Sequence, residues 1–145
     1  MTKLETKLYS TSSLSTGGRD GVTKSLDNSF ELRLNTPKEL GGPGGNGTNP
    51  EQLFASGYSA CFLNAVKYIC MQEKIKFSDE STCKGTVDIG PIDKGFGLEV
   101  LLEVNLPESS QEEAETLVNK AHQVCPYSNA TRGNIYVNIL ATGSK

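Results

Sequence analysis

The chain has 145 residues, of which 36% are hydrophobic and 21% charged, and its formal net charge is -3. This length suits a single domain, residues 1–145, with one main core. The basic residues are scattered rather than gathered in a run or stripe, which argues against a nucleic-acid surface. No apolar leader follows the N-terminal lysines, and no uninterrupted apolar stretch is long enough to span a membrane. We therefore expect a cytoplasmic protein.

The N-terminal third predicts short strands joined by turns. Residues 6–13 are rich in Thr and Ser, and the glycines and aspartate of residues 17–21 are a strong turn signal. Residues 30–34 alternate apolar and charged side chains, the period of a half-buried strand. The glycine-rich residues 35–49 could form a flexible linker, but we expect no second domain, so they predict at least as strongly a loop that packs closely near a site.

A long helix is predicted from Pro50 to about Lys74. Asn49 can cap it, Pro50 fits the first helical position, and Glu51 favours the positive end of the helix dipole. The helix is apolar on nearly every side, and so we expect a partner subunit to cover part of it. Its apolar members are Leu53, Phe54, Tyr58, Ala60, Cys61, Phe62, Leu63, Val66 and Ile69.

The second half predicts a β-hairpin, a helix and a last strand. Residues 83–89 and 96–106 alternate apolar and polar side chains around a turn at residues 90–95. A second helix is capped by Ser109 or Ser110, and Pro126 ends it close to Cys125. A strand at residues 135–139 follows. Strands and helices are partly segregated along the chain, so the fold class is α+β.

The four cysteines are Cys61, Cys70, Cys83 and Cys125. None forms a Cys-x-x-Cys pair and His122 is the only histidine, so a metal site is not expected. For Cys61, inside the apolar helix, packing is the simpler interpretation, while Cys125 at a helix end is the more exposed candidate for reaction. The residues alone therefore leave two candidate reactive thiols.

Arg19 and Glu51 are the candidate charged partners of such a thiol. Taken singly, Arg19 reads as a solvated turn residue and Glu51 as a helix-start acid. As a pair they could form a bidentate bridge that aims the guanidinium at a thiolate.

Four separated blocks of sequence carry a family resemblance. They are Gly17-Gly18-Arg19-Asp20-Gly21, residues 47–55 (GTNPEQLFA), residues 57–62 (GYSACF) and residues 124–134 (VCPYSNATRGN). In this order they resemble the organic hydroperoxide resistance (Ohr) branch of the OsmC/Ohr family over essentially the whole chain. The OsmC branch, which shares the fold and both cysteines, is the near alternative.

The resemblance implies a fold and a chemistry. The fold would be OsmC/Ohr-like, with antiparallel sheets wrapped around long central helices in an intertwined homodimer. Cys61 would attack an organic hydroperoxide and become a sulfenic acid, and Cys125 would condense with it to a disulfide. Arg19 would lower the pKa of Cys61 and orient the peroxide, with Glu51 holding Arg19 in place. No metal or bound cofactor is implied, and an external dithiol such as dihydrolipoamide or a lipoylated protein would recycle the enzyme.

Helix geometry adds one constraint to these roles. Glu51 and Cys61 are ten positions apart, which is about 15 Å along one straight helix. Either the helix breaks near Gly57, or Glu51 and Arg19 serve the Cys61 of the other subunit; we favour the second hypothesis.

Two other functions use the same residues. A binding module could hold a lipid-like ligand with the cysteines as packing, and a redox sensor could form the disulfide only to signal.

An apolar environment of Cys61, with Phe54 and Phe62, favours alkyl or fatty-acid hydroperoxides over hydrogen peroxide, because each buried methylene contributes roughly 0.8 kcal/mol.

Overall fold

The computed structural model describes the whole chain, Met1–Lys145. Its internal contacts divide it into two compact units, Met1–Pro50 and Glu51–Lys145. Each unit is described by itself below, and the single-domain organisation stays a prediction.

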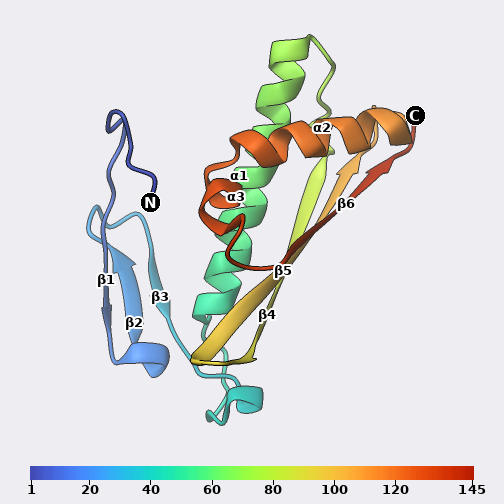
Figure 1. Ribbon diagram of the computed structural model, residues 1–145. Coiled ribbons are helices and arrows are strands. Elements are labelled where there is room, and N and C mark those ends of the chain that lie inside the picture. The colour runs from blue at the N-terminus through green and yellow to red at the C-terminus, as the bar shows by residue number, and fades with distance from the viewer. The chain divides into compact units, whose positions relative to one another are not determined.

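The first unit contains a three-stranded antiparallel sheet, seen in blue in Figure 1. Its strands are β1 (Ser13–Thr16), β2 (Val22–Ser25) and β3 (Glu31–Arg33), paired in that order. The predicted strand at residues 6–13 is wrong for all but its last residue, since residues 1–12 are exposed and carry no strand. Their Thr- and Ser-rich pattern suits a strand, but the β1–β2 pairing begins with Ser13 opposite Ser25 and leaves them without a partner strand in this sheet.

The glycine-rich segment folds back on the end of β3. The backbone N–H of Gly47 donates to Oδ1 of Asn35 over 2.7 Å, and Leu34 forms an isolated bridge with Thr48. One short 3₁₀ turn, η2 (Lys38–Leu40), lies within the loop. The segment is therefore a packed loop, as the sequence predicts.

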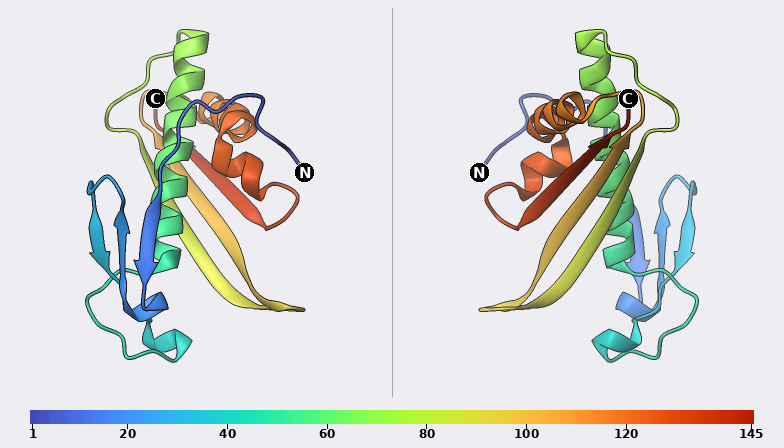
Figure 2. Two further views of the ribbon diagram at one scale, coloured as in Figure 1. Left: turned by 90° about the vertical axis from the view of Figure 1, so that its left-hand side faces the viewer. Right: turned by 90° about the vertical axis from the view of Figure 1, so that its right-hand side faces the viewer.

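The second unit holds the three helices and the second sheet. Helix α1 (Pro50–Glu73) is followed by β4 (Thr82–Ile92) and β5 (Gly95–Leu106). Helices α2 (Gln111–Val124) and α3 (Pro126–Thr131) and strand β6 (Val137–Gly143) complete it. Figure 2 shows α1 running beside the sheet, with α2 and α3 adjacent to it in both views.

The core of this unit lies between the sheet and the helices. Strand β4 pairs antiparallel with β5, and β6 adds to β5 in parallel. One face of β5 is buried against apolar residues of α1 and α2. That face consists of Val100, Leu102, Val104 and Leu106. The hairpin turn is shorter than predicted, because β4 reaches Ile92 and β5 starts at Gly95.

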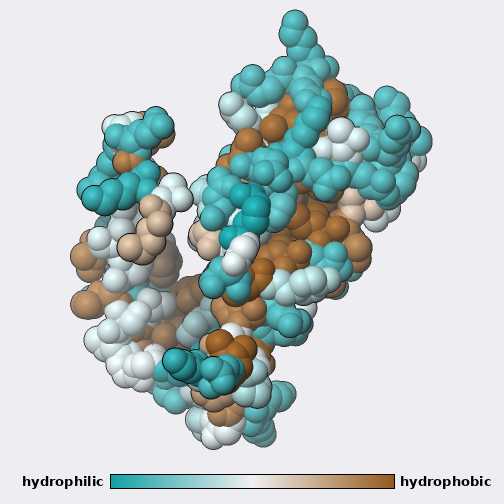
Figure 3. Space-filling view, in the orientation of Figure 1, coloured by the Kyte–Doolittle hydropathy of each residue, from teal (hydrophilic) through white to brown (hydrophobic).

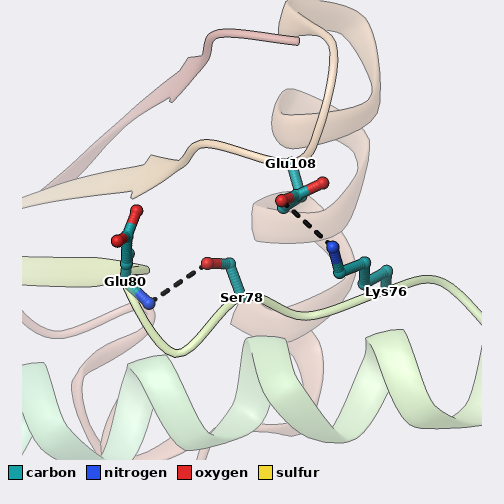
Figure 4. A network of polar contacts seen from close by, with 4 residues as sticks. All are labelled: Lys76, Ser78, Glu80 and Glu108. Carbon is teal, nitrogen blue, oxygen red and sulfur yellow. Dashed lines mark hydrogen bonds and ion pairs between the residues drawn. The ribbon is translucent and has the colours of Figure 1, made fainter.

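Polar contacts hold the connection between α1 and β4. Lys76 Nζ lies 3.1 Å from Oε1 of Glu108, and the backbone N–H of Glu80 donates to Oγ of Ser78 over 3.1 Å (Figure 4). The ion pair is largely exposed, so it adds little to the free energy of unfolding.

Helices α2 and α3 begin in different ways. Ser110 caps α2 by accepting a hydrogen bond from the backbone N–H of Glu113 over 3.2 Å, one of the two predicted caps. Helix α2 ends before Pro126, as predicted, but Pro126 also begins α3, which the sequence analysis missed. Proline suits the first position of a helix as well as it stops the one before it.

Helix α1 runs without a break through Gly57, so the alternative of a broken helix is not seen. Only part of its apolar surface is buried within one chain: Leu53 and Leu63 are half-buried, and Tyr68 and Met71 are exposed. None of the chain's helices combines the length and the apolar character that crossing a bilayer requires.

Candidate active site

Two free thiols meet in the second unit. Cys61 lies on α1, and Cys125 lies at the joint where it ends α2 and begins α3. The two side chains are neighbours, and Cys125 acts on the pKa of Cys61 through its charge and through a side-chain hydrogen bond. The prediction that Cys125 is the more exposed of the two is wrong: Cys125 is 0% exposed and Cys61 is half-buried. Cys125 is part of the core cluster with residues of α1, α2 and β5.

The surroundings of Cys61 within this unit disfavour its thiolate. Burial raises the pKa of the Cys61 thiol, and the neighbouring Cys125 raises it further. A hydrogen bond from the backbone N–H of Tyr127, in the first turn of α3, acts in the opposite direction. Efficient attack on a peroxide by Cys61 therefore needs a further cation or donor near its sulfur.

The other two cysteines are less suited to reaction. Burial raises the pKa of Cys83 on β4 to about 11, and the charge of Cys125 contributes. Cys70 on α1 is 2% exposed, and burial followed by the charges of Glu113 and Glu73 raises its pKa. Both cysteines are thiols at neutral pH.

Arg19 sits in a tightly constrained turn of the first unit. It is the middle residue of η1 (Gly18–Asp20), between β1 and β2. A Cβ on Gly21 would lie 1.7 Å from the Thr16 carbonyl oxygen, so only glycine fits there. The Asp20 carboxylate accepts two hydrogen bonds from Thr36, at 2.9 Å from its N–H and 2.8 Å from its hydroxyl. These bonds lower the pKa of Asp20 and fix the turn that presents Arg19.

Glu51 lies in the first turn of α1, as predicted. On this unbroken helix it stands about 15 Å from Cys61 along the axis. The structure thus brings Cys61 and Cys125 together within one unit and keeps Glu51 far from the sulfur of its own helix.

An apolar cleft of about 980 Å³ adjoins the start of α3. Phe54 of α1, Tyr127 of α3 and the end of the β4–β5 hairpin, including Phe96 and Leu98, line it. Figure 3 shows hydrophobic residues gathered below the polar surface of α2, over the sheet.

A buried chain of hydroxyl groups lies beside the two thiols, and the sequence analysis did not find it. The Tyr58 hydroxyl lies 3.0 Å from Oγ of Ser128 and 3.1 Å from Oγ1 of Thr131. Nδ1 of His122 lies 2.8 Å from the same Ser128 Oγ, so the chain's only histidine is hydrogen-bonded. Burial and then Arg132 lower the pKa of His122. A tyrosine within an otherwise apolar helix was the available signal.

No three His, Cys, Asp or Glu side chains gather closely enough to hold a metal ion. The chemistry that this arrangement offers is that of a dithiol, which can cycle between two thiols and one disulfide.

Comparison with known proteins decides the family. A family model described as OsmC-like protein matches residues 42–139. An organic hydroperoxide resistance protein of Xanthomonas axonopodis pv. citri is 51% identical, over 96% of this chain and 98% of the relative. The chain belongs to the OsmC/Ohr family, in its organic hydroperoxide resistance branch.

Solved structures of Ohr proteins share its fold. One from Vibrio cholerae, with captopril bound in one of its active sites, is 46% identical with a TM-score of 0.90 and covers 96% of this chain and 95% of that chain. Another from Elizabethkingia anophelis is 48% identical with a TM-score of 0.90, over 97% and 99%. The α+β fold, with two small sheets and long helices, is therefore the OsmC-like fold, and membership of the Ohr branch implies an enzyme that detoxifies hydroperoxides.

Proposed function

We propose that this chain is a cysteine-based peroxidase that reduces organic hydroperoxides to alcohols. The observation that carries the proposal is the direct approach of the Cys61 and Cys125 thiols within one unit. The Cys61 thiolate attacks the outer peroxide oxygen, so that an S–O bond forms, the O–O bond breaks and the alkoxide leaves as the alcohol after taking a proton. The Cys125 thiolate then attacks the Cys61 sulfur, so that an S–S bond forms, the S–O bond breaks and the hydroxide leaves as water after taking a proton. An external dithiol, dihydrolipoamide or a lipoylated protein, reduces the disulfide.

Arg19 and Glu51 supply the activation that Cys61 lacks in its own unit. The Arg19 guanidinium stabilises the Cys61 thiolate and orients the peroxide, and Glu51 holds it through a bidentate bridge. Support comes from the raised pKa of Cys61, which a nearby guanidinium would lower, and from the constrained turn that carries Arg19.

The active enzyme is an intertwined homodimer in which Arg19 and Glu51 of one subunit serve the Cys61 of the other. Unbroken α1 separates Glu51 from its own Cys61, and the incompletely buried apolar surface of α1 suits a partner. The Vibrio cholerae relative has more than one active site. The apolar cleft would receive the alkyl chain of the substrate.

The first experiment adds one equivalent of an alkyl hydroperoxide, or separately of hydrogen peroxide, to the reduced protein. Peptide mass spectrometry then locates any new disulfide. We expect a fast Cys61–Cys125 bond with the alkyl hydroperoxide and a slower one with hydrogen peroxide. Cys61→Ser abolishes turnover and Cys125→Ser stops at the sulfenic acid, while Cys70→Ala, a matched change on α1, preserves the reaction. Unchanged thiols with both peroxides would refute the proposal and favour a ligand-binding role.

A mixing experiment tests the shared site. Arg19→Lys and Cys61→Ser variants are each impaired as homodimers. In a heterodimer, however, the Cys61→Ser chain provides Arg19 to the intact Cys61 of the other chain. We expect activity to return when the two are refolded together, and its absence in a verified heterodimer would place both residues in one subunit.

A further inference from the structure

A second set of contacts joins the same two helices as the thiol pair. We propose that Tyr58, Ser128 and His122 are positioning residues that hold Cys125 against Cys61 and so set the rate of disulfide closure. The inference rests on the proposed peroxidase function and concerns its second step alone.

The spacing of these residues carries the first part of the argument. Tyr58 precedes Cys61 by three positions on α1, and Ser128 follows Cys125 by three positions along α3. Residues three apart on a helix lie on one face, one above the other. The Tyr58–Ser128 hydrogen bond is therefore a second link between the helices, one turn away from the place where the disulfide forms.

The joint at Cys125 explains why such a link matters. Cys125 alone separates α2 from α3, as the last cap of one and the first cap of the other. A change in its two backbone dihedrals would swing α3 away from α1. Tyr58 holds α3 at two points, Ser128 and Thr131, both of which are buried. A disulfide needs Cα atoms about 4.4–6.8 Å apart, so a small swing is enough to prevent closure.

One assignment of protons satisfies every contact in this chain. The Thr131 hydroxyl donates to the Tyr127 carbonyl over 3.0 Å, so its oxygen accepts from Tyr58. Tyr58 has then used its one proton and accepts from Ser128. Ser128 in turn accepts from Nδ1 of His122, which must carry a proton.

The direction of these hydrogen bonds defines what His122 contributes. Its Nδ1–H is the first donor of the chain, and the Tyr127 carbonyl is the last acceptor. Tyr127 also provides the backbone N–H that reaches the Cys61 sulfur. Removing the His122 donor leaves the buried Ser128 oxygen with its bond to Tyr58 but with no donor from which to accept, and so loosens the start of α3.

Closure of the disulfide competes with a second oxidation of Cys61, and this competition makes the positioning role measurable. A second hydroperoxide molecule can oxidise the Cys61 sulfenic acid to the sulfinic acid, releasing another alcohol. The faster Cys125 closes the disulfide, the less sulfinic acid forms. A purely structural role would change stability without changing this partition.

The test measures both steps by rapid mixing with cumene hydroperoxide, followed by dimedone trapping of sulfenic acid and mass spectrometry of Cys61. We expect Tyr58→Phe and Ser128→Ala to form sulfenic acid at the wild-type rate but to close the disulfide about tenfold more slowly, as the loss of one buried hydrogen bond allows. The sulfinic fraction at excess peroxide rises accordingly. Tyr68→Phe, the same change elsewhere on α1, keeps the apolar ring and removes only a hydroxyl outside this chain of contacts, so it leaves both steps unchanged.

A matched pair of substitutions at His122 changes a half-buried side chain rather than a fully buried one. Asparagine and leucine have similar sizes, but only asparagine places a donor near the position of Nδ1. We expect His122→Leu to slow closure and His122→Asn to restore it. This pair decides the question if Tyr58→Phe or Ser128→Ala does not fold.

The outcomes separate the two proposals. If the wild-type protein forms no Cys61–Cys125 disulfide, the peroxidase function fails and this inference with it. If the wild-type protein closes its disulfide and the folded variants close theirs equally fast, the positioning role is wrong and the peroxidase function stands.

Discussion

Gly85 offers a direct test of how strand β4 lies on the helix that carries Cys61. A Cβ built on Gly85 would lie 2.9 Å from the carbonyl oxygen of Ala55 and 3.3 Å from Cβ of Ser59, both on α1. The Ala55 contact is with helix backbone, which cannot rotate away. Gly85→Ala must therefore push the strand and the helix apart, and overpacking of this kind costs about 1–3 kcal/mol.

Gly90 provides the matched control on the same strand. A Cβ there would meet no atom within 4 Å, and neither glycine has a positive φ. Both substitutions gain the same small benefit from a stiffer unfolded chain, about 0.4–1 kcal/mol. The difference between the two variants thus isolates the steric cost: we expect Gly85→Ala to be about 1–3 kcal/mol less stable than Gly90→Ala.

Urea denaturation measures this difference at one fixed protein concentration, because the stability of the proposed dimer would depend on concentration. Equal free energies of unfolding for the two variants would refute the reasoning, since β4 would then not pack on α1 at Gly85.

Three further expectations concern other parts of the chain. Because the pKa of Cys83 is raised to about 11, iodoacetamide at neutral pH should modify Cys83 more slowly in the folded protein than in urea, as peptide mass spectrometry would show. The pKa of Asp20 is lowered by Thr36 in the folded state, so its contribution to stability is present above the unfolded pKa and is lost as pH falls through the folded value. The stability deficit of Asp20→Asn, followed by urea denaturation, should therefore shrink from neutral pH toward about pH 3, and a pH-independent deficit would contradict this. Ser110→Ala should cost about 1 kcal/mol in the free energy of unfolding by removing the cap of α2, and an unchanged value would mean that the cap contributes nothing.

The sequence predicted local elements of the fold better than the pairing between distant elements. Helix α1 and the β4–β5 hairpin followed from local periodicity and capping. The parallel pairing of β6 with β5 did not, because periodicity identifies a strand without naming its neighbour. Helix α3 was missed because a proline that stops one helix was not also read as the start of the next.

The candidate site was also only partly predictable from the sequence. Sequence blocks indicated Cys61 and Cys125, but the burial of Cys125 depends on its packing in the core with residues distant in the sequence. Tyr58 and Ser128 are 70 positions apart, and no local pattern predicts that their hydroxyl groups meet. Tyr58 looked like one more apolar helix residue, although a buried tyrosine hydroxyl requires a partner and could have prompted the search.

The two proposed steps should be separable by mutation, because they depend on different residues. In the proposed mechanism the activation of Cys61 depends on Arg19, so replacing Arg19 by lysine should remove the proposed bidentate bridge to Glu51 and slow sulfenic acid formation. Closure of the disulfide, as proposed above, depends on the hydrogen bond between Tyr58 and Ser128, which is not made to the peroxide. The double variant Arg19→Lys/Ser128→Ala should then show the slow first step of one parent and the slow second step of the other, as independent sites do. If the double variant in the rapid-mixing assay departs from both parents, the hydroxyl chain also acts on the Cys61 thiolate, most directly through the Tyr127 N–H at its far end.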